Sequence, residues 1–200
     1  MRYLHKFTIK DLKKKMVAVS GPRQSGKTTF AKAVLKSFSP SEYLSWDNSE
    51  DRKRILKTDW TETSQLIVLD EIHKYSRWKN WIKGIFDKNP EKIRFLFTGS
   101  ARLDVFRKGG DSLFGRYHLW RLHPFCLAEH PLNISNEKAL KRLLDFGGFP
   151  EVYIEGDTTQ AKRWRRQRRD LILREDVRDL ENVKDIKLLD LMLDLLASRV

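Results

Sequence analysis

The sequence has little cysteine and no long apolar run. Its 200 residues include a single cysteine, Cys126, which excludes an internal disulfide and a zinc site built from several cysteines. With no disulfide to maintain, a reducing cytosol is the natural setting, and we predict a cytoplasmic location. No apolar stretch reaches the length of about 18 residues that a membrane span needs, and the N-terminal MRYLHKFTIKDLKKK has no apolar signal-peptide core. We therefore predict no membrane partner.

Acidic residues are fewer than basic ones. Lys and Arg number 40 against 27 Asp and Glu, which gives a formal net charge of +13. Such an excess suggests polyanionic partners such as nucleic acid, nucleotide or anionic lipid, although a solvated lysine-rich surface has the same composition. Hydrophobic residues make up 40% and aromatic residues 11% of the chain, too much for disorder. We expect one globular domain with a small appendage.

Apolar runs of strand length alternate with helical patterns as far as residue 125. The predicted strands are MVAVSG (16–21), YLSWD (43–47), QLIVLD (65–70), IRFLFTGS (93–100) and YHLWRLHPF (117–125). Helical patterns fall between them, at 27–37, within 48–64 and at 77–89. Strands separated by helices indicate βαβ units, so we predict an α/β fold with a mostly parallel sheet.

After residue 125 the pattern becomes helical. We predict helices at 136–146, 158–181 and 185–198. The apolar positions of the last helix cover more than half of the helical wheel, which is too wide a face for a terminal surface helix. Either this helix packs in the middle of a larger structure or the chain continues in the native protein, and we favour a fragment.

The segment GPRQSGKT (21–28) fits G-x-x-x-x-G-K-[ST] between a predicted strand and a predicted helix. The two glycines, Gly21 and Gly26, let backbone N–H groups approach phosphate oxygens. Lys27 is expected to reach the β- and γ-phosphates, and the Thr28 hydroxyl to bind Mg²⁺. A glycine-rich turn that only caps a helix is the alternative. The expected nucleotide-binding residues are Gly21, Pro22, Arg23, Gln24, Ser25, Gly26, Lys27, Thr28 and Thr29.

Two adjacent carboxylates, Asp70 and Glu71, end the strand 65–70. Parallel sheets bind ligands at the carboxyl ends of their strands, where Asp70 can hold Mg²⁺. Glu71 can polarise a water for in-line attack on the γ-phosphate, which points to hydrolysis of ATP to ADP. An acidic turn at a strand end is the alternative.

The strand 93–100 ends in small polar residues, and in a parallel sheet its end lies beside Asp70. Thr98 or Ser100 is predicted to orient the attacking water or contact the γ-phosphate, and we choose Ser100. Either residue is equally compatible with a helix N-cap.

Taken together, GPRQSGKTT, LIVLDE and FLFTGSAR closely resemble the AAA+ ATPases. LFGRYHLWRLHPF (113–125) and GGFPE (147–151) resemble those prokaryotic predicted ATPases in which an AAA+ domain precedes a C-terminal domain of uncharacterised function. The resemblance covers residues 1–180 and implies a three-layer P-loop NTPase sandwich, residues 1–130, followed by a small helical lid or connector, residues 131–200. It also implies ATP and Mg²⁺ as ligands and a switch or assembly ATPase as the function.

The resemblance suggests further roles. Asp70 and Glu71 would be the Walker B pair, with Ser100 or Thr98 as the sensor. Arg116 would be an arginine finger that acts on a neighbouring subunit of a homo-oligomer, with Arg102 as a weaker candidate. The alternative for Arg116 is an exposed turn arginine. GGFP resembles the start of a lid that contacts nucleotide through Gly148 and Pro150, although a helix C-cap explains it equally well.

The segment KRWRRQRR (162–169) carries six basic residues, one tryptophan and no acid. On a helix it could grip phosphates, and Trp164 could stack on a base. A solvated helix with internal ion pairs is the alternative, because acidic residues follow directly. The function that competes with an ATPase is therefore a nucleotide-regulated nucleic-acid-binding protein with weak or no hydrolysis. His73, directly after the acidic pair, could line the site, although a surface position is the default expectation.

Overall fold

The computed structural model describes residues 2–88, 93–100, 103 and 113–172, together with residues 188, 191, 192, 195 and 196. Within these residues five strands form one sheet in the order β2-β3-β4-β1-β5. Every neighbouring pair in this sheet is parallel. The strands are β1 (Met16–Ser20), β2 (Ser41–Ser45), β3 (Leu66–Asp70), β4 (Arg94–Thr98) and β5 (Tyr117–Arg121).

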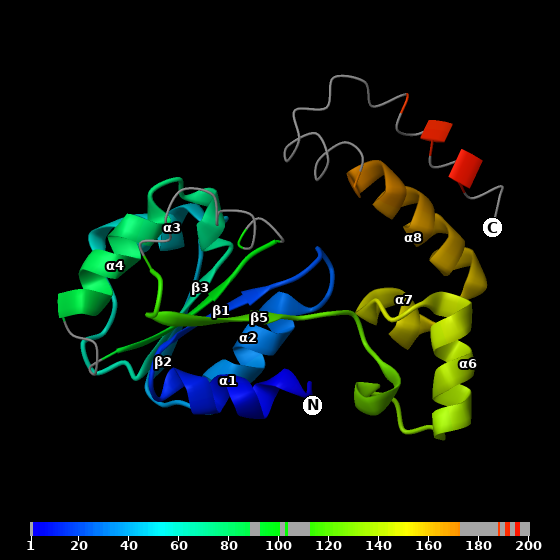
Figure 1. The fold of residues 1–200 in the computed structure, drawn as a ribbon, viewed down its shortest axis with the longest axis horizontal. Coiled ribbons are helices and arrows are strands. Elements are labelled where there is room, and N and C mark those ends of the chain that lie inside the picture. The colour runs from blue at the N-terminus through cyan, green and yellow to red at the C-terminus, as the bar shows by residue number, and fades with distance from the viewer. Residues whose placement is uncertain are drawn as a thin grey trace.

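Helices cover both faces of the sheet (Figure 1). On one face lie α1 (Leu4–Leu12) and α2 (Lys27–Leu35), and on the other lie α3 (Ser49–Lys57) and α4 (Trp78–Lys88). Two short 3-10 helices follow β3 and β5, namely η1 (Ile72–Lys74) and η2 (Leu127–Glu129). The predicted three-layer α/β fold is thus confirmed, and the sheet is parallel throughout its described strands.

The central strand β1 shows why the sequence folds this way. All five of its residues are buried. Met16 and Ala18 belong to the apolar cluster under α3 and α4, whereas Val17 and Val19 belong to the cluster under α1 and α2. Successive side chains of a strand point to opposite faces, so a strand with helices on both sides is apolar along nearly its whole length, here from Met16 to Val19.

The helix α1 was missed in the sequence. Its buried positions include Leu4, Thr8 and Leu12, which are four residues apart and therefore lie on one face of the helix. That spacing was present in the sequence, but the six lysines and arginines among the first 15 residues and the apolar Phe7, which is exposed, obscured it. Among the described residues, no helix combines the length and apolar character needed to cross a membrane.

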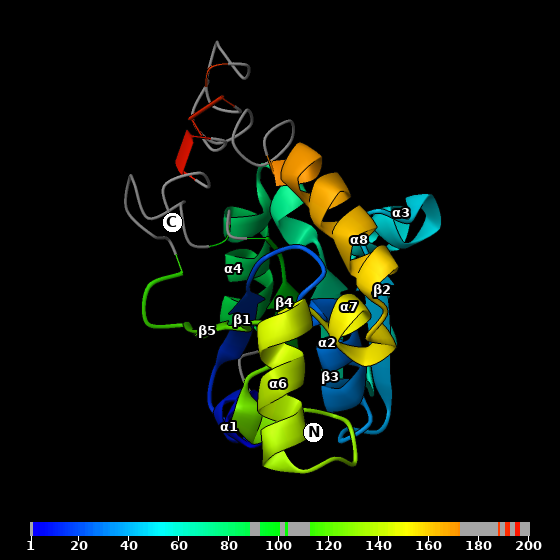
Figure 2. The ribbon, with the colours of Figure 1, turned by 90° about the vertical axis from the view of Figure 1, so that its right-hand side faces the viewer.

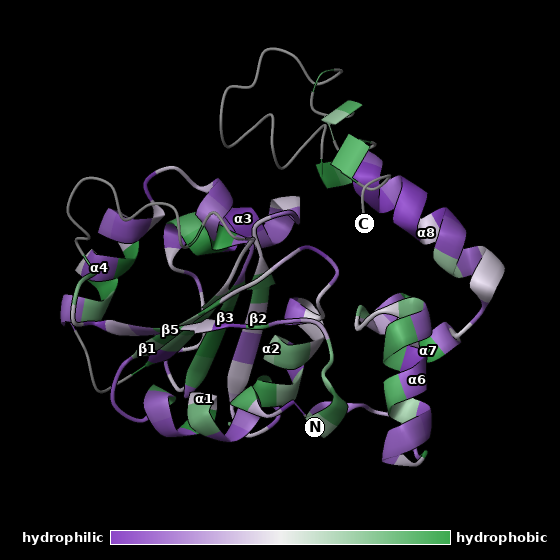
Figure 3. Cartoon of the chain, turned by 45° about the vertical axis from the view of Figure 1, so that its right-hand side comes forward, coloured by the Kyte–Doolittle hydropathy of each residue, from purple (hydrophilic) through white to green (hydrophobic). Residues whose placement is uncertain are grey.

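After η2 the described part of the chain is helical, and we call this part the lid. It consists of α6 (Asn136–Phe146), α7 (Pro150–Glu155) and α8 (Thr158–Leu171). Figures 1 and 2 place this lid beyond the sheet, with α7 next to α2. A small core built from Val152, Ala161 and Trp164 holds α7 to α8. The outer surface of α8 is strongly hydrophilic (Figure 3). The predicted helix 136–146 is confirmed, the predicted boundary at residue 130 stays a prediction, and the predicted helix 185–198 lies largely outside the described residues.

Candidate nucleotide-binding and catalytic site

The loop between β1 and α2 is held in a shape that needs two glycines. Gly26, the N-cap of α2, has φ of 90°, and Gly21 has φ of 154°. A Cβ on Gly21 would lie 2.3 Å from the carbonyl oxygen of Leu122, a contact that no side chain tolerates. The loop is therefore packed directly against the chain that leaves β5. Inside it, Ser25 is fully buried and its N–H donates to the carbonyl of Pro22 at 3.3 Å.

Lys27 places its charge inside this loop. The residue is only 6% exposed. Its Nζ donates to the carbonyl oxygens of Gly21 at 3.1 Å and Pro22 at 3.0 Å. A buried ammonium is costly unless it is hydrogen-bonded, and these carbonyls offset part of that cost. The result is a cation fixed at the first turn of α2, where the helix also presents free N–H groups and the positive end of its dipole.

Three hydroxyl groups contact the carboxylate of Asp70. Thr28 Oγ1 donates to Asp70 Oδ2 at 2.9 Å, across 42 positions of sequence. The hydroxyls of Tyr43 and Thr98 also contact the Asp70 carboxylate. Burial and the neighbouring Asp70 carboxylate raise the pKa of Tyr43 far above its ordinary value, so Tyr43 is a permanent donor. No sequence signal identified Tyr43, because only the pairing of β2 with β3 brings it to this carboxylate.

Glu71 directly follows β3 and has a left-handed backbone conformation, with φ of 56°. Its Oε2 lies 3.8 Å from His73 Nε2 and 3.6 Å from Lys74 Nζ. Burial raises the pKa of the Glu71 carboxyl, while the positive charges of Lys27 and Lys74 oppose this rise. A carboxylate in that setting is a better proton acceptor than an exposed one.

The two sensor candidates occupy different places. Thr98 Oγ1 contacts Asp70 and accepts the Glu71 N–H at 3.3 Å, so it touches both members of the acidic pair. Ser100 Oγ lies 3.2 Å from His73 Nε2 and thus reaches Glu71 only through that ring. His73 is buried, so its expected surface position is wrong. The choice of Ser100 over Thr98 stays a prediction, although the direct contacts belong to Thr98.

Arg116 lies away from this cluster. Arg116 precedes β5, and its carbonyl accepts the N–H of Met16 at the start of β1. This is the amino edge of the sheet, whereas the loop 21–28 follows the carboxyl end of β1. The Arg116 side chain forms two hydrogen bonds with Asp87, of 2.7 Å and 3.0 Å. A role for Arg116 within its own chain's site is thus excluded by position, and a role toward a neighbour stays a prediction. Arg102 is outside the described residues.

The lid touches the phosphate-binding loop at two points. Pro150 at the start of α7 approaches Gly26, with 3.6 Å between its Cγ and the position of a Cβ on Gly26. Arg168 of α8 donates to the carbonyl of Arg23 at 3.1 Å and to Gln24 Oε1 at 3.3 Å. Both α7 and α8 therefore contact the loop. The carbonyl of Gly148 instead accepts the N–H of Phe125 at 2.6 Å, which joins the start of α7 to the segment that follows β5.

The basic segment 162–169 is partly engaged in contacts within the chain, although Lys162, Arg165 and Arg166 are exposed. Arg168 is bound to the loop and lies 3.9 Å from the centre of the Phe149 ring. Arg165 donates to the carbonyl of Asp145 at 2.5 Å. Trp164 is 8% exposed and packs on Phe149, with 5.0 Å between the ring centres. The prediction that Trp164 stacks on a base is wrong, because the lid core buries it.

A cavity of about 560 Å³ opens where these elements meet. It is lined by the phosphate-binding loop as far as Thr29, by the ends of β2 and β3 with Asp70 and Glu71, and by Pro150 and Glu151 of the lid. Small-molecule sites usually have volumes of about 300–1,000 Å³. Its cations and carboxylates suit a ligand that combines phosphate groups with a divalent cation.

Comparison with known proteins agrees with this geometry. The family model described as AAA domain matches residues 13–130, more than half of the chain. The chain belongs to the AAA domain family. Residues 137–200 of this AAA protein match a second model, described as a domain of unknown function. The fold of the chain and its AAA family together identify a P-loop ATPase domain, which is a nucleotide-binding module.

Curated relatives of the AAA protein are longer. An uncharacterised protein of Mycobacterium tuberculosis is 28% identical over 152 residues, which span 75% of this chain and 33% of that protein. An uncharacterised protein of Methanocaldococcus jannaschii is 24% identical and is aligned over 96% of this chain and 49% of its own length. The chain thus spans a third to a half of the curated relatives that it matches.

Two solved structures share the fold. AMPPCP-bound DnaA from Aquifex aeolicus superposes with a TM-score of 0.52 at 18% identity, over 91% of this chain and 69% of that one. The Walker-type ATPase of Pyrococcus abyssi has the same TM-score at 13% identity, over 89% of this chain and 74% of that one. At these identities the likeness concerns the fold alone.

Proposed function

We propose that this AAA domain binds Mg–ATP in the loop 21–28 and hydrolyses it to ADP and phosphate. The observation that carries the proposal is the hydrogen bond between Thr28 and Asp70, which joins the end of the phosphate-binding loop to the end of β3. Lys27 would hold the β- and γ-phosphates, and the N–H groups at the start of α2 would hold the remaining phosphate oxygens. The AMPPCP ligand of the DnaA structure supports a nucleoside triphosphate as the ligand class.

The residues fit Mg²⁺ in their chemistry. Within the described residues no three His, Cys, Asp or Glu side chains are placed so that they could hold a metal ion together. Thr28 and Asp70 instead offer one hydroxyl and one carboxylate, the hard oxygen ligands that Mg²⁺ takes together with water and phosphate oxygens. When bound, Mg²⁺ would neutralise charge on the β- and γ-phosphates.

Glu71 would act on the attacking water. Its carboxylate would accept a proton as the water oxygen bonds to the γ-phosphorus and the bond from that phosphorus to the bridging β–γ oxygen breaks, with ADP as the leaving group. Thr98 would hold Glu71 in place through its contact with the Glu71 N–H. His73 and Lys74 flank the same carboxylate and would fix its orientation.

The direct test is phosphate release by the purified chain with ATP. We expect steady hydrolysis in the presence of Mg²⁺ and its loss when EDTA is added, because Thr28 and Asp70 can act on phosphate only through the cation. Hydrolysis that continues unchanged in EDTA would show that the assigned metal ligands are wrong. The absence of hydrolysis together with tight ATP binding would support the nucleotide-regulated alternative.

The sensor assignment can be tested with two substitutions. We expect Thr98→Val to lower turnover by about 10-fold or more, because it removes one of the three hydroxyl partners of Asp70 and leaves the Glu71 N–H without its hydroxyl acceptor. We expect a smaller loss for Ser100→Ala, since Ser100 contacts only His73. Measurement of kcat for both variants decides the point. A larger effect at Ser100 would restore it as the sensor.

We further propose that the lid makes the domain a nucleotide-driven switch. Arg168 donates hydrogen bonds to Arg23 and Gln24 in the loop that would hold the phosphates, so nucleotide binding to the loop would shift the position of α8. In an assembly ATPase this shift of α8 would be transmitted to neighbouring copies, to which Arg116 would supply an arginine finger. The coupling needs no contact between nucleotide and α8.

Removal of the arginine link should uncouple the lid. We expect ATP with Mg²⁺ to protect the wild-type lid from limited proteolysis, and Arg168→Gln to lose most of this protection because α8 then has no donor for Arg23 and Gln24. Arg163→Gln removes the same charge from an exposed position of the same helix and should behave as wild type. Equal protection in all three proteins would contradict the switch.

A further inference from the structure

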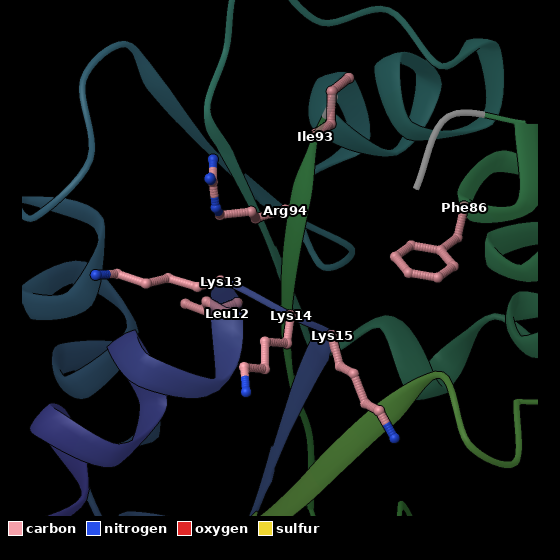
Figure 4. Close-up of a pocket in the computed structure, with 7 residues that line it drawn as sticks. All are labelled: Leu12, Lys13, Lys14, Lys15, Phe86, Ile93 and Arg94. Atoms are coloured by element: carbon pink, nitrogen blue, oxygen red, sulfur yellow. The ribbon is translucent and has the colours of Figure 1, made fainter. Parts of the chain in front are cut away.

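A second hollow lies at the amino edge of the sheet, opposite the phosphate-binding loop. Its volume is about 550 Å³, and Lys13, Lys14, Lys15 and Arg94 line it together with Leu12, Phe86 and Ile93 (Figure 4). The three lysines form the connector from α1 to β1, and Arg94 begins β4. A five-residue strand separates the two edges by roughly 17 Å, so a nucleotide in the first cavity does not occupy this one. We call this hollow the amino-edge cleft.

The amino-edge cleft is positive as far as the structure describes its lining. None of the described residues that line it is an aspartate or a glutamate. Among the described residues, no ion pair joins its lysines or Arg94 to a carboxylate. The neighbouring carboxylates are engaged elsewhere, since Asp87 pairs with Arg116 and Asp11 accepts the Trp120 indole N–H at 2.9 Å. Like charges gathered around a concave surface raise its potential and attract anions.

The directions of the side chains indicate the shape of the anion. In Figure 4 the three lysines fan out from their connector, and Arg94 leaves the sheet on another course. Cations arranged in this way do not enclose one compact phosphate. They suit a chain of anionic groups that passes along the edge and meets them in turn. Three of the four cations also sit on consecutive residues, whose α-carbons are about 3.8 Å apart.

The apolar lining points to single-stranded nucleic acid. Phe86 projects from α4 toward the strands, and both Phe86 and Ile93 are half-buried within the hollow. Single strands bind to positive grooves that contain an aromatic side chain, because every base can stack. A lipid surface would instead require apolar side chains that protrude around the lysines. We propose that the amino-edge cleft binds single-stranded nucleic acid through its phosphates, at a site separate from both the nucleotide cavity and the segment 162–169.

The test compares two triple variants that remove equal charge. Fluorescence anisotropy with a labelled 20-nucleotide oligothymidine, measured across a salt series, gives affinity and its salt dependence. We expect Lys13→Gln/Lys14→Gln/Lys15→Gln to weaken binding by about 10-fold or more and to lower the slope of log K against log salt by about 2, since a single strand contributes about 0.7 per phosphate contact. The matched control, Lys162→Gln/Arg163→Gln/Arg166→Gln, should stay within about threefold of wild type.

ATP hydrolysis is measured in the same proteins. It should be unchanged in the amino-edge variant, so that a failure of the ATPase assignment and a failure of the cleft are read separately. Should the triple variant fold poorly, Lys13→Gln/Lys14→Gln changes only exposed side chains and is expected to give a slope lower by about 1.4.

Five outcomes would overturn the proposal. The first two are a wild type that does not bind the oligonucleotide at low salt and an equal loss of affinity in both triple variants. Loss confined to the 162/163/166 variant would move the site to α8. Polyglutamate that competes as well as unlabelled oligothymidine at equal charge, or capture by vesicles of 30% phosphatidylserine without oligonucleotide binding, would assign the cleft to a different polyanion.

Discussion

We expect Glu71→Gln to lower ATP turnover at least about 100-fold while ATP binding remains within a few fold of wild type. Glutamine keeps the shape of the side chain but cannot accept the proton of the attacking water. The fold should tolerate the change, because burial raises the pKa of this carboxyl and a neutral group there avoids the cost of desolvating a charge. Phosphate release gives the turnover, and titration with a fluorescent ATP analogue gives the affinity.

The matched control for Glu71→Gln is Glu50→Gln. Glu50 is exposed in the first turn of α3, so this substitution removes the same charge without touching the site. It should leave both turnover and affinity as in wild type. Turnover by Glu71→Gln at the wild-type rate would rule out Glu71 as the base. Loss of ATP binding in the same variant would mean that Glu71 serves binding and not the chemical step.

We expect Lys27→Met to abolish the stabilisation that ATP gives to the fold. A ligand that binds only the folded state at 100 times its Kd adds about 2.7 kcal/mol to the free energy of unfolding, and the variant should gain almost none of this. Without ATP the variant should unfold at or slightly above the wild-type temperature. Lys27 is 6% exposed, and its hydrogen bonds offset only part of the cost of desolvating its charge, so methionine of similar length relieves the remainder.

Thermal unfolding with and without Mg–ATP measures both effects in one experiment. Lys36→Met is the control, since Lys36 is exposed at the C-terminal end of the same helix. It should keep the full shift of Tm with ATP. An ATP-dependent shift in Lys27→Met equal to that of wild type would show that the loop does not bind phosphate through this lysine. A large fall in Tm without ATP would show that Lys27 is structural.

Within the site, the sequence was most informative where the chemistry is local. Gly21, Gly26, Lys27 and Thr28 belong to one turn and the start of one helix, and their spacing alone placed them around a common point. The structure gives each the backbone geometry that the pattern requires, with positive φ at both glycines. The acidic pair was found for the same reason, because an apolar strand that ends in two carboxylates is unusual on grounds of desolvation.

Contacts between distant segments were beyond sequence reasoning. Tyr43 and Thr98 reach Asp70 only because β2 and β4 both pair with β3. The sequence could not separate Thr98 from Ser100, because they lie two residues apart at the end of one strand. Only the register of β4 beside β3 shows which of them reaches Asp70. Trp164 was expected to face a ligand, although a helix that folds back on Phe149 buries it.

The sequence by itself determined the α/β class, the positions of the strands and the phosphate-binding loop, because burial on both faces and tight turns leave periodic, local marks in the order of residues. Tertiary structure alone decided which hydroxyl contacts Asp70, that Arg168 reaches Arg23 and Gln24, and that Lys15 and Arg94 share one cleft. These contacts depend on strand order, in which β4 lies between β3 and β1, and on the path of the lid. Neither is encoded in any short segment, since both result from how the whole chain buries its apolar surface.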